Sequence, residues 1–209
     1  IGLGNIGLKY DLKNESNQKI LTHSKAFFYH ENFELVAGVD FKQNNRNEFE
    51  SKYKLKSFRN IEEASSKINP EIIVVSTPTN QHLNNIDLIL KLFTPKIIIC
   101  EKPLSLKINE AKKIIELCEI KKVRIYINYF RRILPGYLKV LSHIKSNKFK
   151  APFKGVCFYS KGLFNSSSHF INLFQFLFGR VVNIKLINKN NSKEDPEPDF
   201  NLEFEGGNI

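Results

Sequence analysis

Three places along this chain carry groups of the types that bind anions or move protons. A glycine-rich turn occupies Ile1–Gly7, the tripeptide Glu101-Lys102-Pro103 lies a hundred residues on, and His169 follows in the last third. Burial lowers the pKa of a lysine, so its ammonium group becomes a candidate proton donor or a ligand for a substrate hydroxyl. A neutral histidine can accept a proton near pH 7. The three places together predict a reaction centre beside a bound anionic ligand.

The glycine turn has the spacing of a dinucleotide-binding fingerprint, Gly-x-Gly-x-x-Gly. Gly2 would permit the tight turn, Gly4 the approach of a pyrophosphate, and Gly7 close packing of the following helix. Asn5 and Ile6 lie between them, where backbone N–H groups at a helix start would face the phosphates. The chain opens directly on this turn and contains no methionine. We therefore expect the sequence to be a fragment whose first strand is missing.

Asp40 ends a predicted second strand, Phe33–Asp40. At this position of a dinucleotide fold, a carboxylate accepts hydrogen bonds from the ribose hydroxyls and repels a 2′-phosphate, which predicts NAD as the cofactor. Lys42 and Arg46 follow closely and leave NADP open as an alternative. A solvent-facing turn aspartate is the simpler interpretation.

Two further loops follow predicted strands at the edge where open α/β sheets bind ligands. Ser76, Thr77 and Pro78 follow one strand, with His82 shortly after, and Glu101-Lys102-Pro103 follows the next. We expect Ser76, Thr77, Pro78, His82 and Glu101 to border the cofactor, and a cis peptide before Pro103 is compatible with the turn. The alternatives are a surface histidine at residue 82 and a solvated turn lysine at residue 102.

The elements that must position these groups alternate regularly. Continuous apolar runs at 71–76 and 96–101 are typical of parallel strands buried on both faces, and residues 123–128 are predicted as a further strand. Helices are predicted at 49–53, at 61–68, around Leu83, Ile86 and Leu90, and with Ile108, Ala111, Ile115 and Cys118 on one face. A polar insertion at 11–19 interrupts the first helix, which resumes at 21–30. This alternation predicts a doubly wound parallel Rossmann sheet.

After residue 128 the pattern changes. Helices are predicted at 135–146 and 169–178, strands at 153–159, 182–188 and 200–204, and a loop at 188–198. Strands no longer alternate with helices, which is typical of an α+β domain with a mainly antiparallel sheet. We therefore predict an NAD(P)-binding domain at 1–128 and a partial substrate and oligomerisation domain at 129–209.

Composition excludes several classes of protein. The net charge of +11 is spread along the 209 residues without an arginine-rich block, which argues against a nucleic-acid partner. The longest apolar runs are too short to cross a bilayer. Cys100, Cys118 and Cys157 form no Cys-x-x-Cys pair, which favours reduced thiols, a cytoplasmic location and no metal site.

The motifs together resemble the glucose–fructose oxidoreductase, inositol dehydrogenase and MocA family. The resemblance rests on the glycine turn, Val-Asp at residues 39–40, Thr-Pro-x-x-x-His at 77–82, Glu-Lys-Pro at 101–103, Tyr-x-Arg-Arg at 129–132, and His-x-x-Asn at 169–172. It implies a nicotinamide-dependent dehydrogenase of a sugar, cyclitol or nucleotide sugar that forms a homo-oligomer. By the same resemblance Lys102 lies beside the reacting hydroxyl, and Tyr129 and Arg131 line the substrate cleft.

One family motif is altered. The usual Asp-x-Gly-x-His-x-x-Asp stands here as Asn165 to Asn172, with His169 kept, Ser167 in place of glycine and both acids replaced by asparagine. The resemblance places Asn165 in the substrate cleft and Asn172 in the catalytic group with His169. Without a carboxylate beside it, His169 would stay neutral at pH 7 and act as the base. The alternatives are a histidine that only packs at a helix start, and a non-catalytic NAD-binding regulatory protein of the same fold.

Overall fold

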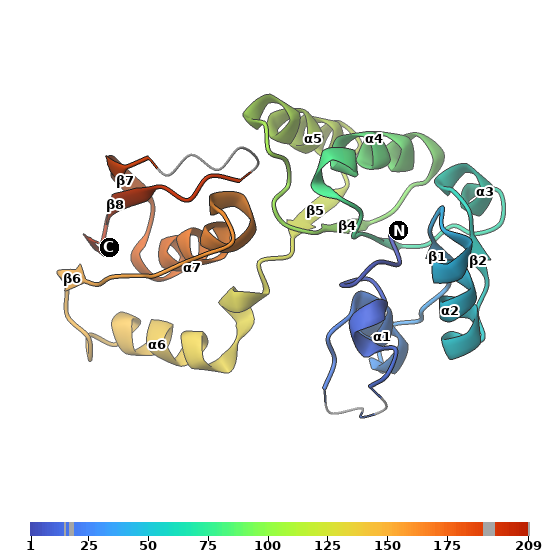
Figure 1. Cartoon of the computed structure of the whole chain (residues 1–209), viewed down its shortest axis with the longest axis horizontal. Coiled ribbons are helices and arrows are strands. Elements are labelled where there is room, and N and C mark those ends of the chain that lie inside the picture. The colour runs from blue at the N-terminus through green and yellow to red at the C-terminus, as the bar shows by residue number, and fades with distance from the viewer. Residues whose placement is uncertain (15, 17–18, 190–194, 209) are drawn as a thin grey trace. The chain divides into compact units, whose positions relative to one another are not determined.

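The computed structural model describes residues 1–14, 16, 19–189 and 195–208. The chain divides into two compact units, an N-terminal unit of residues 1–128 and a C-terminal unit of residues 129–209. The elements of both units are labelled in Figure 1.

The main sheet of the N-terminal unit contains three parallel strands in the order β3-β4-β5. Their bounds are Ile72–Val75, Ile97–Cys100 and Arg124–Ile127. The register places Val75 beside Cys100 and Cys100 beside Ile127, so the three strands end together at one edge. The predicted parallel Rossmann sheet is confirmed for these strands.

Two helices cover the same sheet and complete its core. Helices α4 (His82–Leu92) and α5 (Ile108–Ile120) lie side by side in Figure 1. Ile86 and Ile98 have no exposed surface, and neither has Ile114. Burying an aliphatic side chain of this size stabilises a fold by about 1.5–3 kcal/mol.

The predicted inward face of α5 is partly wrong. Ile108 is 70% exposed and Ile115 is 44% exposed, whereas Ile114 and Cys118 are buried. The helix carries isoleucine at both 114 and 115, so apolar spacing alone does not decide which of them faces the sheet. Burial raises the pKa of the Cys118 thiol to about 11, so this thiol is unreactive.

A second, two-stranded parallel sheet is formed by β1 (Gly38–Val39) and β2 (Ser57–Phe58), with helices α2 (Gln43–Tyr53) and α3 (Ile61–Ser65). The predicted strand Phe33–Asp40 is therefore wrong over most of its length. Residues 33–37 border a cavity instead of a neighbouring strand. The backbone N–H and C=O groups of a strand need hydrogen-bond partners on a neighbouring strand. In this segment β2 provides that neighbour only for Gly38 and Val39.

The segment after the glycine turn does not continue as one helix. A short 3-10 helix η1 (Lys9–Asp11) follows, and helix α1 begins only at His23 and ends at Tyr29. The predicted interruption at 11–19 and the later helix agree with this arrangement, although residues 15, 17 and 18 lie outside the described residues. Asp11 and Lys25 are both buried at the base of the insertion.

The C-terminal unit combines two helices with a four-stranded sheet in the order β6-β9-β8-β7. The strands are β6 (Phe153–Lys154), β7 (Val181–Asn188), β8 (Asp199–Phe204) and β9 (Gly207–Asn208), and the helices are α6 (Pro135–Lys145) and α7 (Ser168–Phe178). The β7–β8 and β8–β9 pairs are antiparallel, which confirms the mainly antiparallel sheet. The strand predicted at 153–159 is wrong beyond Lys154, because only Phe153 and Lys154 pair with β9. Part of the predicted 188–198 loop, residues 190–194, lies outside the described residues.

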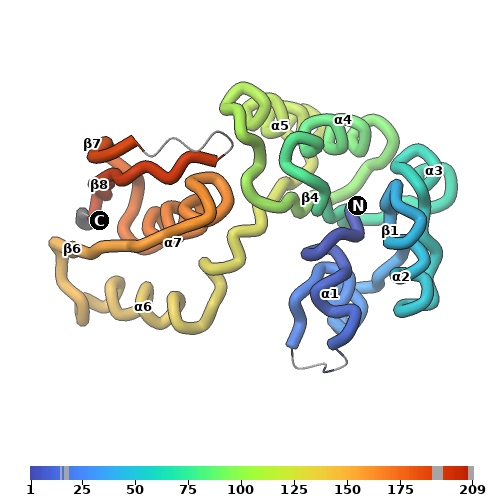
Figure 2. The backbone as a smooth tube through the Cα atoms, in the orientation of Figure 1, coloured from blue at the N-terminus to red at the C-terminus, as the bar shows by residue number. Residues whose placement is uncertain are grey.

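Aromatic side chains hold α7 against the sheet of the C-terminal unit. Phe174 and Phe178 each lie 6.2 Å from Phe204 of β8, measured between ring centroids. The tube in Figure 2 shows α7 between β8 and α6. Such ring pairs contribute about 0.5–1.5 kcal/mol beyond their buried area. The apolar run at 170–178 therefore forms the core of this unit.

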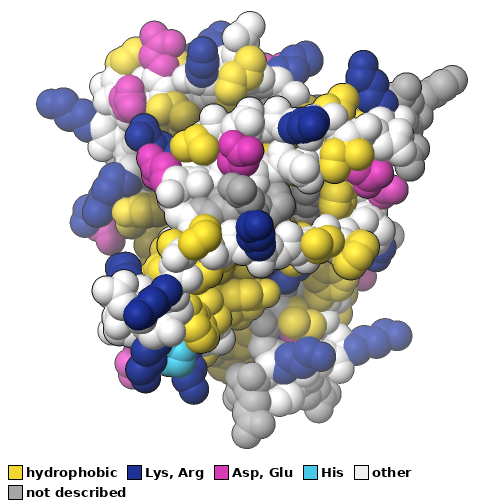
Figure 3. All heavy atoms as spheres, turned by 90° about the vertical axis from the view of Figure 1, so that its left-hand side faces the viewer, with side chains coloured by type: hydrophobic (Ala, Val, Ile, Leu, Met, Phe, Trp, Pro, Cys, Tyr) yellow, Lys and Arg dark blue, Asp and Glu magenta, His cyan; other side chains and the backbone are white. Residues whose placement is uncertain are grey.

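The surface carries both charged and apolar groups. On the face drawn in Figure 3, Lys and Arg side chains are scattered and hydrophobic side chains gather near the centre. Exposed apolar residues of the C-terminal unit include Val156, Phe158, Val182 and Ile184. Among the described residues, no helix is long and apolar enough to span a membrane.

Candidate active site

Two of the three glycines in the turn are required by the packing of the protein itself. Gly2 has φ +90°, and a Cβ there would lie 2.7 Å from the backbone of Ser76. A Cβ on Gly7 would lie 2.0 Å from the carbonyl oxygen of Gly2. Neither position has room for a larger residue, so both glycines shape the turn.

Gly4 differs from its two neighbours in the motif. A Cβ at Gly4 would meet no protein atom within 4 Å, and its φ is not in the left-handed region. The fold itself therefore does not require glycine here. Within the described part of the chain, the N–H groups of Asn5, Ile6 and Gly7 donate no hydrogen bond to another protein group. An open approach beside consecutive N–H donors is the geometry that binds an anion.

Asp40 lies at the end of β1 and is 9% exposed. Its Oδ2 accepts hydrogen bonds from Leu3 N at 2.8 Å and Asn45 Nδ2 at 3.0 Å, and its Oδ1 accepts one from Lys42 N at 2.8 Å. The carboxylate therefore fixes the glycine turn to the start of α2. Oδ1 accepts one bond here, which leaves it a second lone pair for a ligand hydroxyl.

The Arg46 side chain contacts the backbone at Asp40. Its Nη1 donates to the carbonyl oxygens of Asp40 at 2.8 Å and Phe41 at 3.0 Å. Its Nη2 donates to the Gln43 side chain. The guanidinium is thus held by carbonyl groups of the protein itself.

The loop after β3 is hydrogen-bonded to the glycine turn. Ser76 Oγ donates to the carbonyl oxygens of Gly2 at 2.8 Å and Ile1 at 3.1 Å, and Thr77 Oγ1 accepts from Asn85 Nδ2 at 2.9 Å. Pro78 precedes a 3-10 helix, η2 (Thr79–Gln81). These contacts hold the loop at the carboxyl end of the strands.

His82 requires a correction. It has no exposed surface, so it neither borders a cofactor nor lies on the surface. Its ring lies between two carbonyl oxygens, with Nε2 3.0 Å from Thr77 O and Nδ1 3.1 Å from Leu104 O. A buried ring that joins these two backbone groups ties the loop after β3 to the loop after β4.

Glu101 follows β4, and its carboxylate is 13% exposed. Oε1 lies 2.8 Å from His23 Nε2 and accepts a hydrogen bond from Asn128 Nδ2 at 2.7 Å. Burial raises the pKa of Glu101, but hydrogen bonds from His23, Asn128 and the Lys102 backbone hold it below its usual range. The carboxylate is therefore ionised at neutral pH.

Lys102 lies next in the chain, half-buried at the end of β4. The peptide bond between Lys102 and Pro103 is cis. The structure thus places Lys102 at the edge where β3, β4 and β5 end, which is also the edge where the Ser76 loop meets the glycine turn. This is the edge at which the sequence predicts a reaction centre.

In the C-terminal unit, His169 is 9% exposed and lies against two aromatic rings. The Tyr129 and Phe130 rings approach it edge-on, at 5.8 Å and 5.5 Å between centroids. Burial raises the pKa of Tyr129, although a hydrogen bond with Ser168 lowers it in part. The structure brings Tyr129 and His169 together within this unit.

Two arginines complete this cluster. Arg131 lies over the rings of Phe130 and Phe170, at 5.5 Å and 5.1 Å from their centroids. Arg132 Nε donates to Asn172 Oδ1 at 2.5 Å, and its Nη2 donates to the Asn172 carbonyl oxygen at 3.3 Å. Asn172 is thus positioned by a guanidinium, a partner that the motif comparison does not predict.

Asn165 lies at the other end of the altered motif and is exposed. Its backbone N–H donates to Asp195 Oδ2 at 2.9 Å, and that of Phe164 donates to Oδ1 at 2.8 Å. Asp195 thereby caps the π-helix η4 (Leu163–Ser167) that leads into α7.

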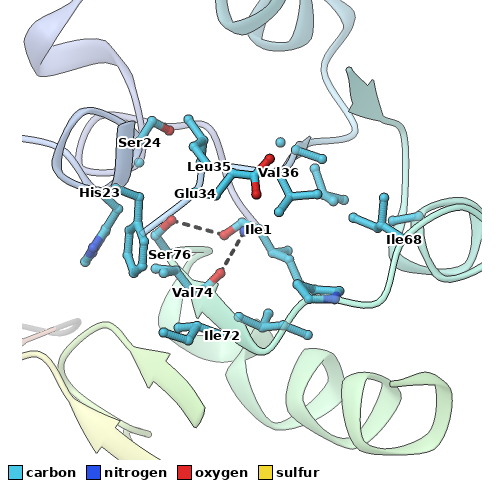
Figure 4. A pocket seen from close by; sticks show the side chains of 18 of the residues that line it. Ile1, His23, Ser24, Glu34, Leu35, Val36, Ile68, Ile72, Val74 and Ser76 are labelled. Carbon is cyan, nitrogen blue, oxygen red and sulfur yellow. Dashed lines mark hydrogen bonds between the residues drawn. The ribbon is translucent and has the colours of Figure 1, made fainter. Parts of the chain in front are cut away.

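A cavity of about 460 Å³ lies in the N-terminal unit. Its lining includes Gly2 and Gly7 but none of Gly4, Asn5 and Ile6, and it runs along residues 32–39 and 68–74. Figure 4 shows Ile1 at its centre, with the Ile1 nitrogen bonded to Val74 O at 2.7 Å. On the other side, Gly2 N donates to Val39 O at 2.8 Å. The cavity therefore lies beside Ile1 and Gly2, which connect the two sheets. It is lined by the predicted cofactor residues Gly2, Gly7 and Ser76, but not by Gly4 or Asp40.

Four contacts of this region were not predicted from the sequence. His23 and Asn128 hold Glu101, Asn45 holds Asp40, and Arg132 holds Asn172. All four contacts join residues that the fold brings together. For Arg132 a signal existed, because it is part of the Tyr-x-Arg-Arg motif, whereas none marked His23 or Asn45.

The parallel sheet and the glycine turn define the class of protein. Both are features of NAD-binding Rossmann folds, and residues 1–129 match the family described as an oxidoreductase family with an NAD-binding Rossmann fold. The chain belongs to this family, the Gfo/Idh/MocA oxidoreductases.

Individual relatives agree with this assignment. The rhizopine catabolism protein MocA of Rhizobium meliloti is 31% identical over 74 residues, which are 35% of this chain and 23% of that protein. The uncharacterized oxidoreductase C115.03 of Schizosaccharomyces pombe is 32% identical over 91 residues, 44% of this chain and 24% of that protein. This chain thus matches about a quarter of the length of each relative.

Solved structures share the fold of both units. A candidate myo-inositol dehydrogenase from Sinorhizobium meliloti 1021 superposes with a TM-score of 0.76 at 20% identity, covering 100% of this chain and 66% of that one. The WlbA dehydrogenase of Bordetella pertussis, solved with NADH and UDP-GlcNAcA, gives 0.72 at 18% identity, covering 90% and 62%.

Proposed function

We propose that this chain forms part of an NAD-dependent oxidoreductase that transfers a hydride between nicotinamide and a hydroxyl or carbonyl carbon of a sugar-like substrate. The observation that carries the proposal is Gly4. The fold explains Gly2 and Gly7 but not Gly4, whose open side lies next to the N–H groups of residues 5–7. A pyrophosphate in that space explains why the position has no side chain.

The residues present fit such a cofactor. The backbone of Gly4 to Gly7 would hold the pyrophosphate, and the remaining lone pair of Asp40 Oδ1 would accept a ribose hydroxyl. When bound, nicotinamide supplies the hydride acceptor. NAD is favoured over NADP because a 2′-phosphate would meet the Asp40 carboxylate.

The protein's own groups would orient the substrate and move its proton. Lys102 would hold the reacting oxygen, and His169 would accept the hydroxyl proton during oxidation. Tyr129, Arg131 and Asn165 would contact the substrate, with Asn172 held beside them by Arg132. The WlbA dehydrogenase complex with UDP-GlcNAcA and the candidate myo-inositol dehydrogenase support a sugar, cyclitol or nucleotide sugar as the substrate class. Assembly into a homo-oligomer stays a prediction.

A non-catalytic NAD-binding protein of the same fold is the second candidate. The replacement of both acids of the altered motif, at Asn165 and Asn172, favours it. Retention of Lys102 and His169 favours the enzyme. A screen of the chain for NAD and NADP reduction against sugars, cyclitols and nucleotide sugars separates the two.

The glycine turn is tested by Gly4→Val. We expect the variant to fold normally but to lose NAD binding at least tenfold, measured by calorimetry, because the new side chain fills the approach to the N–H groups. Gly136→Val is the matched control, since a Cβ on Gly136 of α6 also meets no atom within 4 Å. Normal NAD affinity in Gly4→Val would refute the proposed cofactor site.

A further inference from the structure

His23 connects the glycine turn to Glu101-Lys102-Pro103, although no motif marks it. Its backbone N–H donates to Ile6 O, inside the turn, at 3.0 Å. Its ring Nε2 lies 2.8 Å from Glu101 Oε1, and the two side chains are only 16% and 13% exposed. In Figure 4 the imidazole points away from Ile1 and the middle of the cavity. One residue thus contacts both halves of the predicted site in this unit.

The contact with Glu101 extends to Lys102. The Glu101 carboxylate accepts hydrogen bonds from the His23 ring, from Asn128 Nδ2 and from the backbone N–H of Lys102. Three donors from different parts of the unit fix this carboxylate in one orientation. Because one of these donors is the backbone N–H of Lys102, the carboxylate also fixes the backbone from which the Lys102 side chain extends.

We propose that His23 is a positioning residue that holds Lys102 in place through Glu101 and links it to the phosphate-binding turn. The inference rests on the proposed function. The His23 ring is bonded to Glu101, so it would act on Lys102 through that carboxylate and not on the substrate directly. A displaced lysine would lower turnover, because small errors in the position of a reacting group reduce rates strongly.

Amide hydrogen exchange at Lys102 tests this inference without requiring turnover. In His23→Leu, which cannot bond to Glu101, we expect exchange at Lys102 to accelerate about tenfold, since one donor that orders the carboxylate is lost. His23→Gln keeps a donor at a similar position and should restore exchange to within threefold. His30→Leu, an exposed histidine at the end of α1, is the matched control and should change nothing.

Enzyme kinetics provide the second measurement, on any substrate found in the screen. We expect kcat to fall about tenfold in His23→Leu and to recover in His23→Gln, while NAD affinity stays within threefold of wild type. Far-UV circular dichroism verifies folding, and His23→Phe replaces the leucine variant if that variant does not fold.

The outcomes separate this inference from the proposed function. Unchanged exchange at Lys102 in a folded His23→Leu protein would overturn the inference, and so would failure of glutamine to restore it. A wild-type protein that reduces no cofactor would refute the enzyme. In that case faster exchange at Lys102 would still support the positioning role of His23.

Discussion

The insertion that follows the glycine turn depends on a buried lysine. Lys25 of α1 is 1% exposed, and its Nζ donates to the carbonyl oxygens of Ser16 at 2.7 Å, Asn14 at 3.0 Å and Lys19 at 3.1 Å. Asp11 Oδ1 lies 3.8 Å from the same ammonium. The side chain therefore organises the insertion and the start of the helix that carries His23.

We predict that Lys25→Met lowers the free energy of unfolding by about 3 kcal/mol. Removing one partner of a buried ion pair costs about 3–5 kcal/mol because the other charge stays buried. The lower end applies, since methionine retains the apolar stem and the carbonyl groups of the exposed Ser16 and Lys19 can bind water. With a urea m-value of about 2 kcal/mol/M, the midpoint should fall by about 1.5 M.

The assay is urea unfolding at pH 7, with Lys13→Met as the matched control. Lys13 lies in the same segment but is exposed, so its loss should change stability by less than about 0.5 kcal/mol. Burial raises the pKa of Asp11, but hydrogen bonds from Leu21, Thr22 and Asn14 together with Lys25 lower it overall. The stabilisation by Asp11 is thus complete above its unfolded pKa of about 4 and is lost as pH falls further. A Lys25→Met midpoint equal to that of the control would refute the argument.

Two further predictions concern the proposed reaction. Asp40→Ala should narrow the preference for NAD over NADP, and calorimetric titration with both cofactors measures it; tighter NADP binding by the wild type would contradict the assignment of Asp40. Lys102→Ala and His169→Ala should each lower turnover by about 10²–10⁴, and the double variant should lose less than the sum because the groups act on one step. Full activity of His169→Ala would leave this histidine with a packing role only.

The strands that sequence reasoning predicted well are those whose burial is decided locally. The runs at 71–76 and 96–101 contain three or more consecutive β-branched residues, and such runs fit strands covered on both faces. Both became strands of the parallel sheet, β3 and β4. The predicted antiparallel sheet of the C-terminal unit likewise follows from the change in the order of elements.

Two strands are shorter in the structure than the sequence predicts, and the local sequence does not explain why. Residues 33–37 and 155–159 have β-forming composition, but a strand also needs a neighbour for its backbone groups. Residues 33–37 face the cavity beside Ile1, and only Phe153 and Lys154 of the other segment pair with β9. Whether an apolar run becomes a strand is therefore decided by distant parts of the chain.

The candidate site was predictable as a set of motifs but not as a set of contacts. Spacing marked Gly2, Gly4 and Gly7, yet the different reasons for the three glycines appear only when a Cβ is placed on each. His82 matched a motif and proved to be buried between carbonyl groups. A histidine's sequence position does not reveal whether its ring faces a ligand or the protein.

Asn172, which replaces an acid of the family motif, also shows that a motif does not reveal the contacts of a side chain. The motif comparison treats it as the loss of a carboxylate beside His169, but the side chain is bonded to Arg132, whose guanidinium also lies 5.4 Å from the Phe176 ring centroid. A carboxylate at this position would neutralise that guanidinium, whereas an amide oxygen accepts its hydrogen bond and leaves the charge. The replacement therefore adds one positive charge to the cluster around η3 (Phe130–Ile133) and α7 while keeping Arg132 in place. The change at Asn172 therefore alters the charge around Arg132 as well as the group that lies in the altered motif.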